Sequence, residues 1–206
     1  MSATLRKTVL PIALALAAML AGCGPTPKLI GYPPGALPVE YDRATTYSAC
    51  LVASVTMAAN YAENRPRFQV PEVLADLKKA GADETKVADL KNYMARKGLT
   101  VWNLAGTMDE KPWTGLGFWL REWRSPPVCV INRIGGNADY NHAVVVIGLR
   151  ENRDMESADR IHYLDPSADS PLYTCSLEAF DEMWARCGHA MLVVTKGPPE
   201  QAEVKP

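Results

Sequence analysis

The chain has 206 residues, with 22 Lys and Arg against 23 Asp and Glu, and its formal net charge is −1. Hydrophobic residues make up 48% of it, which is enough for one core of ordinary size. No run of basic residues occurs, so nucleic acid is excluded as an expected partner. No pair of cysteines has zinc-knuckle spacing, and neither a structural metal nor a cofactor is predicted.

Residues 1–22 have the organisation of a bacterial export signal. Arg6 and Lys7 form a short positive region, and the apolar run after them is too short to span a bilayer comfortably. The run ends in "LAGC" (20–23), which resembles the lipobox of bacterial lipoproteins, where the cysteine thiol is acylated after export. Cys23 is therefore the predicted lipidation site and the predicted contact with the membrane. An ordinary secretory signal or an uncleaved anchor is the alternative.

The sequence after the lipobox predicts a tethered domain. Residues 23–38 are rich in Pro and Gly and are expected to form an extended tether. Residues 39–196 have the size of one domain, and 197–206 resemble a disordered tail. Gly24 follows the cysteine in place of the aspartate typical of inner-membrane retention. This favours a location on the periplasmic side of the outer membrane over the inner membrane.

The first predicted element of the domain is a buried helix over residues 49–62. The segment has only three polar residues, and a helix that is apolar nearly all round is buried. Ser48 or Thr46 is the expected N-cap. Cys50 therefore lies in the first turn.

The remaining elements indicate an α+β domain, with helices first and antiparallel strands second. Strands that are apolar on both faces are expected to lie centrally in a covered sheet. In chain order, the predicted elements are helices 71–80 and 85–98, strand 99–104, helix 113–123, strands 128–132, 143–149 and 161–165, helix 176–186 and strand 190–194.

Three further cysteines could form disulfides in an oxidising compartment. Cys175 and Cys187 flank a predicted helix, which would separate them by about 18 Å. A disulfide needs Cα atoms within about 7 Å, so these two are not expected to pair. Either one could pair with Cys129.

Strand spacing brings a histidine next to a carboxylate. His142 begins one strand, and the polar loop 150–159 leads into the next. Cross-strand positions in an antiparallel hairpin sum to a constant, which places His142 opposite residues 165–167. Asp165 therefore falls beside His142, whereas alternation puts His162 on the other face of the strand.

Such a pair is what a thiol nucleophile requires. The thiolate is the reactive form of cysteine, and a helix N-terminus or a nearby imidazolium favours it. A carboxylate fixes the tautomer and orientation of the imidazole. Cys50 has the position of a nucleophile, His142 that of a base and Asp165 that of its orienting acid.

Four segments strengthen this interpretation: "YSACLVASVTMAANY", "NHAVVVIGL", "IHYLDPSADSPLYTCSLEAFDEMW" and "AMLVV". Together they resemble the papain-like peptidases that cut bacteriocin leaders after a double glycine, over about residues 36–195. The resemblance implies a papain-like fold in which the nucleophile helix packs on an antiparallel sheet. It also implies Cys50 as nucleophile, His142 as general base and Asp165 as orienting acid.

Two positions depart from the family pattern. Leu51 stands where members usually have glycine, and Ala44 and Thr45 stand where they have the glutamine of the oxyanion hole. Thr45 could offer a hydroxyl there. Loss of one oxyanion donor typically costs about 2.7–4 kcal/mol of transition-state stabilisation.

Other polar and aromatic residues carry less information. Tyr140 and Asn141 adjoin the base and are expected to line the cleft, whereas His162 and His189 have no predicted role. Phe180 and Trp184 are expected to lie in the core. A second aromatic group is expected to serve in packing and not as a substrate platform: Trp113, Phe118, Trp119 and Trp123.

Three functions remain open at this point. The first is a cysteine peptidase that cleaves a peptide or protein of an export system. The second is an endopeptidase or amidase that cuts peptidoglycan stems. The third is a catalytically dead relative that binds an exported protein as a chaperone.

Overall fold

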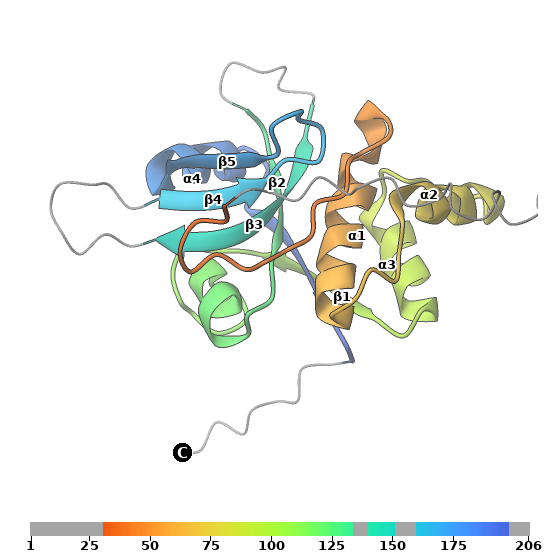
Figure 1. Cartoon of the computed structure of the whole chain (residues 1–206), viewed down its shortest axis with the longest axis horizontal. Helices are drawn as coiled ribbons and strands as arrows, with labels where there is room; N and C mark the ends of the chain where they lie inside the picture. The colour runs from red at the N-terminus through yellow and green to blue at the C-terminus, as the bar shows by residue number, and fades with distance from the viewer. Residues whose placement is uncertain (1–30, 134–139, 151–159, 198–206) are drawn as a thin grey trace, which may run out of the picture. The chain divides into compact units, whose positions relative to one another are not determined.

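A six-stranded antiparallel sheet forms the centre of the protein, which we describe from a computed structural model (Figure 1). The structure describes residues 31–133, 140–150 and 160–197. The strand order is β1-β6-β2-β3-β4-β5. The strands are β1 (Thr100–Ala105), β2 (Val128–Ile131), β3 (His142–Arg150), β4 (Arg160–Leu164), β5 (Leu172–Ser176) and β6 (Ala190–Thr195). The α+β prediction is confirmed.

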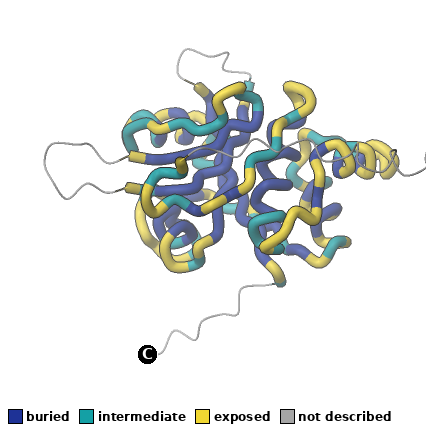
Figure 2. The backbone as a smooth tube through the Cα atoms, in the orientation of Figure 1, coloured by how far each residue is buried: buried dark blue, intermediate teal, exposed yellow. Residues whose placement is uncertain are grey.

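Helices α1 (Cys50–Glu63), α2 (Val70–Lys79) and α3 (Val87–Arg96) precede the sheet in the chain and gather beside it. Helix α1 packs on β3 and β6, whereas α4 (Leu177–Ala185) packs on β2, β4 and β5. Every residue of α1 from Cys50 to Ala59 is buried, as expected for a helix that is apolar nearly all round (Figure 2).

The structure corrects two predicted elements. Strand β5 was not predicted, because "LYTCS" is only half buried at the sheet edge and has no clear apolar alternation. The predicted helix 113–123 is reduced to a single π-helical turn, Phe118–Glu122. Trp113 has a positive φ of 71°, and the Gly115 N–H donates to the Lys111 carbonyl at 2.6 Å in a turn, so the helix cannot begin there.

The start of α1 also differs from prediction. A short 3-10 turn, Tyr47–Ala49, precedes the helix, and Thr46 occupies its N-cap without a side-chain cap hydrogen bond. Ser48 lies within the turn, and its hydroxyl donates to the Glu84 carboxylate. The 3-10 turn therefore replaces the predicted side-chain cap, and Cys50 is the first residue of the α-helix.

The four described cysteines are all free. Helix α4 is continuous between Cys175 and Cys187, in agreement with the prediction that they do not pair. The alternative pairings with Cys129 are wrong. Cys129 is fully buried in β2, and β3 and β4 separate it from Cys175 in β5 by three strand spacings, roughly 14 Å. The Cys187 thiol instead contacts the Asn141 side-chain oxygen at 3.3 Å.

The folded domain begins before residue 39, within the predicted tether. Leu37 is buried, and its N–H donates to the Ile147 carbonyl of β3 at 2.7 Å. The predicted signal segment 1–22, Cys23 and nearly all of the predicted tail lie outside the described residues. In the described part of the chain, no helix has the length and apolar character needed to cross a bilayer.

One buried hydrogen bond joins α1 to the strand that carries His142. The Ser54 hydroxyl donates to the Ala143 carbonyl at 3.1 Å, and Ser54 is completely buried. Thr56, two residues further along α1, is equally buried, but its hydroxyl has no hydrogen-bond partner. These two residues make opposite contributions, because an unpaired buried polar group destabilises the folded state.

We expect Ser54→Ala to lower the free energy of unfolding by about 1–3 kcal/mol, because the Ala143 carbonyl loses a buried donor. Thr56→Val is the matched control on the same helix. It removes an unpaired hydroxyl at nearly constant shape and should be neutral or stabilising. Urea unfolding of the three proteins measures both changes, and equal destabilisation by the two substitutions would contradict the assignment.

Candidate active site

His142 and Asp165 form a buried hydrogen-bonded pair. His142 Nε2 lies 2.7 Å from Asp165 Oδ1, and the two side chains are 5% and 0% exposed. Val145 pairs with Leu164, and β4 ends there, so Asp165 reaches the start of β3. The hairpin spacing predicted this contact.

Two further groups hold the Asp165 carboxylate. The Ser167 N–H donates to Oδ1 at 2.8 Å, and the Arg133 guanidinium forms an ion pair with Oδ2. Sequence reasoning missed Arg133, which follows β2. Since β3 lies between β2 and β4, no local spacing relates Arg133 to Asp165.

The hydrogen bond to Asp165 defines the tautomer of His142. A carboxylate only accepts, so Nε2 carries the proton and Nδ1 is left as an acceptor. Nδ1 is buried and has no hydrogen-bond partner. Burial, with a smaller contribution from the positive charge of Arg133, lowers the pKa of His142 to about 4. The imidazole is therefore neutral near pH 7, and its contact with Asp165 is a hydrogen bond, not an ion pair.

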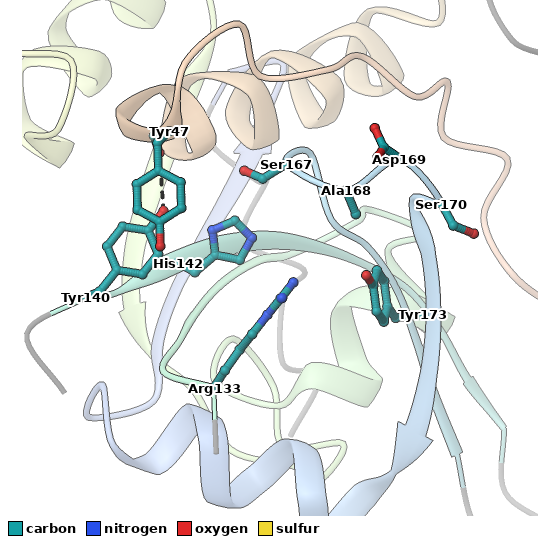
Figure 3. Close-up of a pocket in the computed structure, with 9 residues that line it drawn as sticks. All are labelled: Tyr47, Arg133, Tyr140, His142, Ser167, Ala168, Asp169, Ser170 and Tyr173. Atoms are coloured by element: carbon teal, nitrogen blue, oxygen red, sulfur yellow. Dashed lines mark hydrogen bonds between the residues drawn. The ribbon is translucent and has the colours of Figure 1, made fainter. Parts of the chain in front are cut away.

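Cys50 and His142 line two neighbouring cavities. A cavity of about 580 Å³ contains His142 and Arg133, together with the loop after β4 and Tyr173 (Figure 3). A cavity of about 470 Å³ is lined by Cys50 and by apolar side chains from α1, β2 and the start of α3. Tyr47 and Tyr140 line both cavities. The candidate nucleophile and base thus flank one tyrosine pair.

This tyrosine pair joins the start of α1 to the start of β3. The two rings stack with centroids 4.0 Å apart at 18°, and the Tyr140 hydroxyl donates to the Tyr47 carbonyl at 3.2 Å. The Tyr140 ring also lies 6.1 Å from the His142 ring, nearly parallel to it. Because His142 Nδ1 has no partner, the Cys50 thiol is not hydrogen-bonded to the base in this state.

Of the other polar residues singled out in the sequence, some line the two cavities and others lie outside them. Asn141 lines the Cys50 cavity, as predicted for it and for Tyr140. Thr45 is exposed and lines neither cavity, so its role as oxyanion donor stays a prediction. His162 contacts Thr174, and His189 contacts Asp181.

The predicted aromatic core residues pack against one another. Trp113, Phe118, Trp119 and Trp123 form a cluster around the π-helical turn, with ring centroids 5.4–6.4 Å apart. Phe180 and Trp184 of α4 are completely buried. None of these six residues lines the two cavities at the candidate site. Phe180 and Trp184 are core residues as predicted, and the other four pack against one another, with only Trp119 fully buried among them.

In the described part of the chain, no three His, Cys, Asp or Glu side chains are grouped as metal ligands. The groups that the site offers are a thiol, a neutral imidazole whose Nδ1 can accept a proton, and a buried carboxylate. The Asp165 carboxylate is held by three partners: the imidazole of His142, the backbone N–H of Ser167 and the guanidinium of Arg133.

Two solved structures have this fold. The peptidase domain of Streptococcus ComA, a bifunctional ABC transporter involved in a quorum-sensing pathway, aligns with a TM-score of 0.53 and 13% identity, over 76% of this chain and 97% of that domain. A protein from Bacillus anthracis described as a C39-like peptidase aligns with a TM-score of 0.53 and 15% identity, over 78% of this chain and 96% of its own. No protein-family model matches the sequence, and no curated protein is a detectable relative.

The protein therefore has the fold of the C39 papain-like peptidases. The predicted fold and the predicted resemblance to double-glycine peptidases are confirmed at the level of structure.

We expect Arg133→Met to raise the pKa of His142 above its value of about 4. The substitution removes a cation that repels the protonated ring, and it leaves the Asp165 carboxylate without its guanidinium partner. Both changes favour the imidazolium form of His142. Arg43→Met is the matched control, because Arg43 pairs with the cavity residue Asp169 and has no contact with Asp165. NMR titration of the His142 ring measures the shift, and an unchanged or lower pKa would show that Arg133 does not act on the base.

Proposed function

We propose that the protein is a cysteine peptidase in which Cys50 is the nucleophile, His142 the general base and Asp165 the orienting acid. The observation that carries the proposal is the buried His142–Asp165 pair, which leaves Nδ1 of His142 without a hydrogen-bond partner. His142 and Cys50 line neighbouring cavities that share the Tyr47–Tyr140 pair. The C39-type fold supports the same assignment.

The neutral imidazole defines how the reaction starts. Nδ1 takes the Cys50 proton as Sγ attacks the peptide carbonyl carbon, and the carbonyl electron pair moves to oxygen. The imidazolium that forms is stabilised by Asp165 and then protonates the departing amine. Water, deprotonated by the same ring, hydrolyses the thioester. Substrate binding must bring Sγ and Nδ1 together, and catalytic hydrogen bonds often tighten only at this stage.

The proposed substrate is a peptide bond in an exported or secreted polypeptide, with a Gly-Gly site as the first choice to test. The Cys50 cavity has an apolar wall that includes Leu51, Val87 and Val130, which suits a peptide with small or apolar side chains. Peptidoglycan stem peptides and uncleaved protein ligands are the competing alternatives, and the same assays distinguish them.

Incubation of the purified protein with a library of Gly-Gly-containing peptides tests the proposal. We expect hydrolysis that is abolished in Cys50→Ala and reduced about 10²–10⁴-fold in His142→Gln, the range for loss of a general base. Cys187→Ala, which removes a free thiol outside both cavities, should retain activity.

Two outcomes would overturn this assignment. Cleavage of purified peptidoglycan but of no peptide would establish the second alternative. Binding of peptides without cleavage, together with equal rates of Cys50 alkylation in the parent and in His142→Gln, would establish a non-catalytic binding protein.

We further propose that Cys23 carries a lipid that anchors the protein on the periplasmic side of the outer membrane. The proposal rests on the lipobox-like "LAGC" and on Gly24. Cys23→Ser should move the protein from the membrane to the soluble fraction and abolish incorporation of a palmitate analogue, whereas Cys187→Ser should change neither. Labelling that persists in Cys23→Ser would contradict the proposal.

A further inference from the structure

The geometry points to Tyr140 as an oxyanion-hole donor, a catalytic residue that takes the place of the missing glutamine. This inference rests on the proposed function and adds a residue to the same site. Attack on a carbonyl leaves a negative oxygen close to Sγ, and a papain-like site stabilises it with the backbone N–H of the nucleophile and one side-chain donor. Cys50, as the first residue of α1, supplies the backbone group.

The residues at the usual position of the side-chain donor do not reach the cavities. Ala44 has no polar side chain, and its N–H donates to the Pro166 carbonyl at 2.9 Å. Thr45 is exposed and lines neither cavity. A donor has to come from another part of the chain.

Tyr140 approaches the thiol from the histidine strand. It stands two residues before His142 and lines both the Cys50 cavity and the His142 cavity. Its hydroxyl donates to the carbonyl of Tyr47, three residues before Cys50, at 3.2 Å. Because Tyr140 and Cys50 line the same cavity, the phenol is a side-chain donor available to an oxygen on the carbon bonded to Sγ.

Several contacts preorganise this hydroxyl. The Tyr47 ring stacks on the Tyr140 ring, and Asn132 donates to the Tyr140 backbone carbonyl at 3.2 Å. Burial is the main cause of a raised pKa for the Tyr140 phenol, with smaller contributions from hydrogen bonds and charge at Tyr47 and Cys50. The phenol therefore keeps its proton throughout the range in which the enzyme would work.

The step requires no change in the protonation of Tyr140. As the Cys50 sulfur bonds to carbon, the carbonyl electron pair moves to oxygen, and the phenol exchanges its bond to the Tyr47 carbonyl for a charge-assisted bond to the oxyanion. When the intermediate collapses, the electron pair returns, the bond to the leaving group breaks, and the phenol again donates to Tyr47.

Two reagents separate this role from a general effect on the thiol. Acylation of Cys50 by p-nitrophenyl acetate passes through a tetrahedral oxyanion and releases p-nitrophenolate, whereas alkylation by iodoacetamide displaces iodide at carbon without an oxyanion. Tyr140→Phe keeps the stacked ring and removes only the hydroxyl. Tyr93→Phe is the matched control, since it removes a phenol hydroxyl that donates to Asp76 outside both cavities.

We expect Tyr140→Phe to slow acylation about 10²–10³-fold, the effect of losing one oxyanion donor, and to change alkylation by no more than about twofold. Tyr93→Phe should leave both rates within about twofold. Rates are measured by the p-nitrophenolate burst and by peptide mapping of Cys50, with urea unfolding as a check of folding.

The remaining outcomes overturn the inference in different ways. Acylation that is unaffected in Tyr140→Phe would exclude the hydroxyl as a donor. An equal fall in both rates would show that Tyr140 acts on the thiol itself. If Cys50 of the parent protein reacts with neither reagent, the proposed function fails as well.

Discussion

The buried carboxylate of Asp165 is the constraint on which the candidate site depends. It is completely excluded from solvent, and an uncompensated charge there would be very costly. Three donors from different parts of the chain compensate it: His142 from β3, Arg133 after β2 and the backbone of Ser167. These contacts of Asp165 fix the orientation of the imidazole at the end of β4. They also hold the loop after β4, which lines the larger cavity.

Sharing of Asp165 between Arg133 and His142 sets the resting charge of the site. A carboxylate bound only to the imidazole would favour imidazolium, whereas a nearby guanidinium and burial disfavour it. His142 is consequently neutral, and it can take a proton instead of holding one. The Tyr140 phenol beside it is also uncharged, because burial raises its pKa. In the resting site, a neutral imidazole and a neutral phenol therefore lie near one ion pair, Arg133–Asp165.

Cys50 and His142 belong to two elements that pack on each other, helix α1 and strand β3. The Ser54–Ala143 hydrogen bond joins α1 to β3 beneath the site, and the Tyr47–Tyr140 stack joins them at its mouth. Between these contacts, Cys50 and His142 Nδ1 face the same region without a hydrogen bond.

The sequence by itself determined the elements with strong local signals. The apolar run after Cys50 specifies a buried helix, the continuous apolar strands specify a covered sheet, and hairpin spacing places Asp165 beside His142, because antiparallel register is a local geometric rule. Only the tertiary structure decided which of these elements meet. Arg133 reaches Asp165 across an intervening strand, β5 forms because β4 offers it an edge, and Tyr140 lines the same cavity as Cys50 because α1 packs on β3. Such contacts depend on the packing of distant segments, for which a single sequence has no periodic signal.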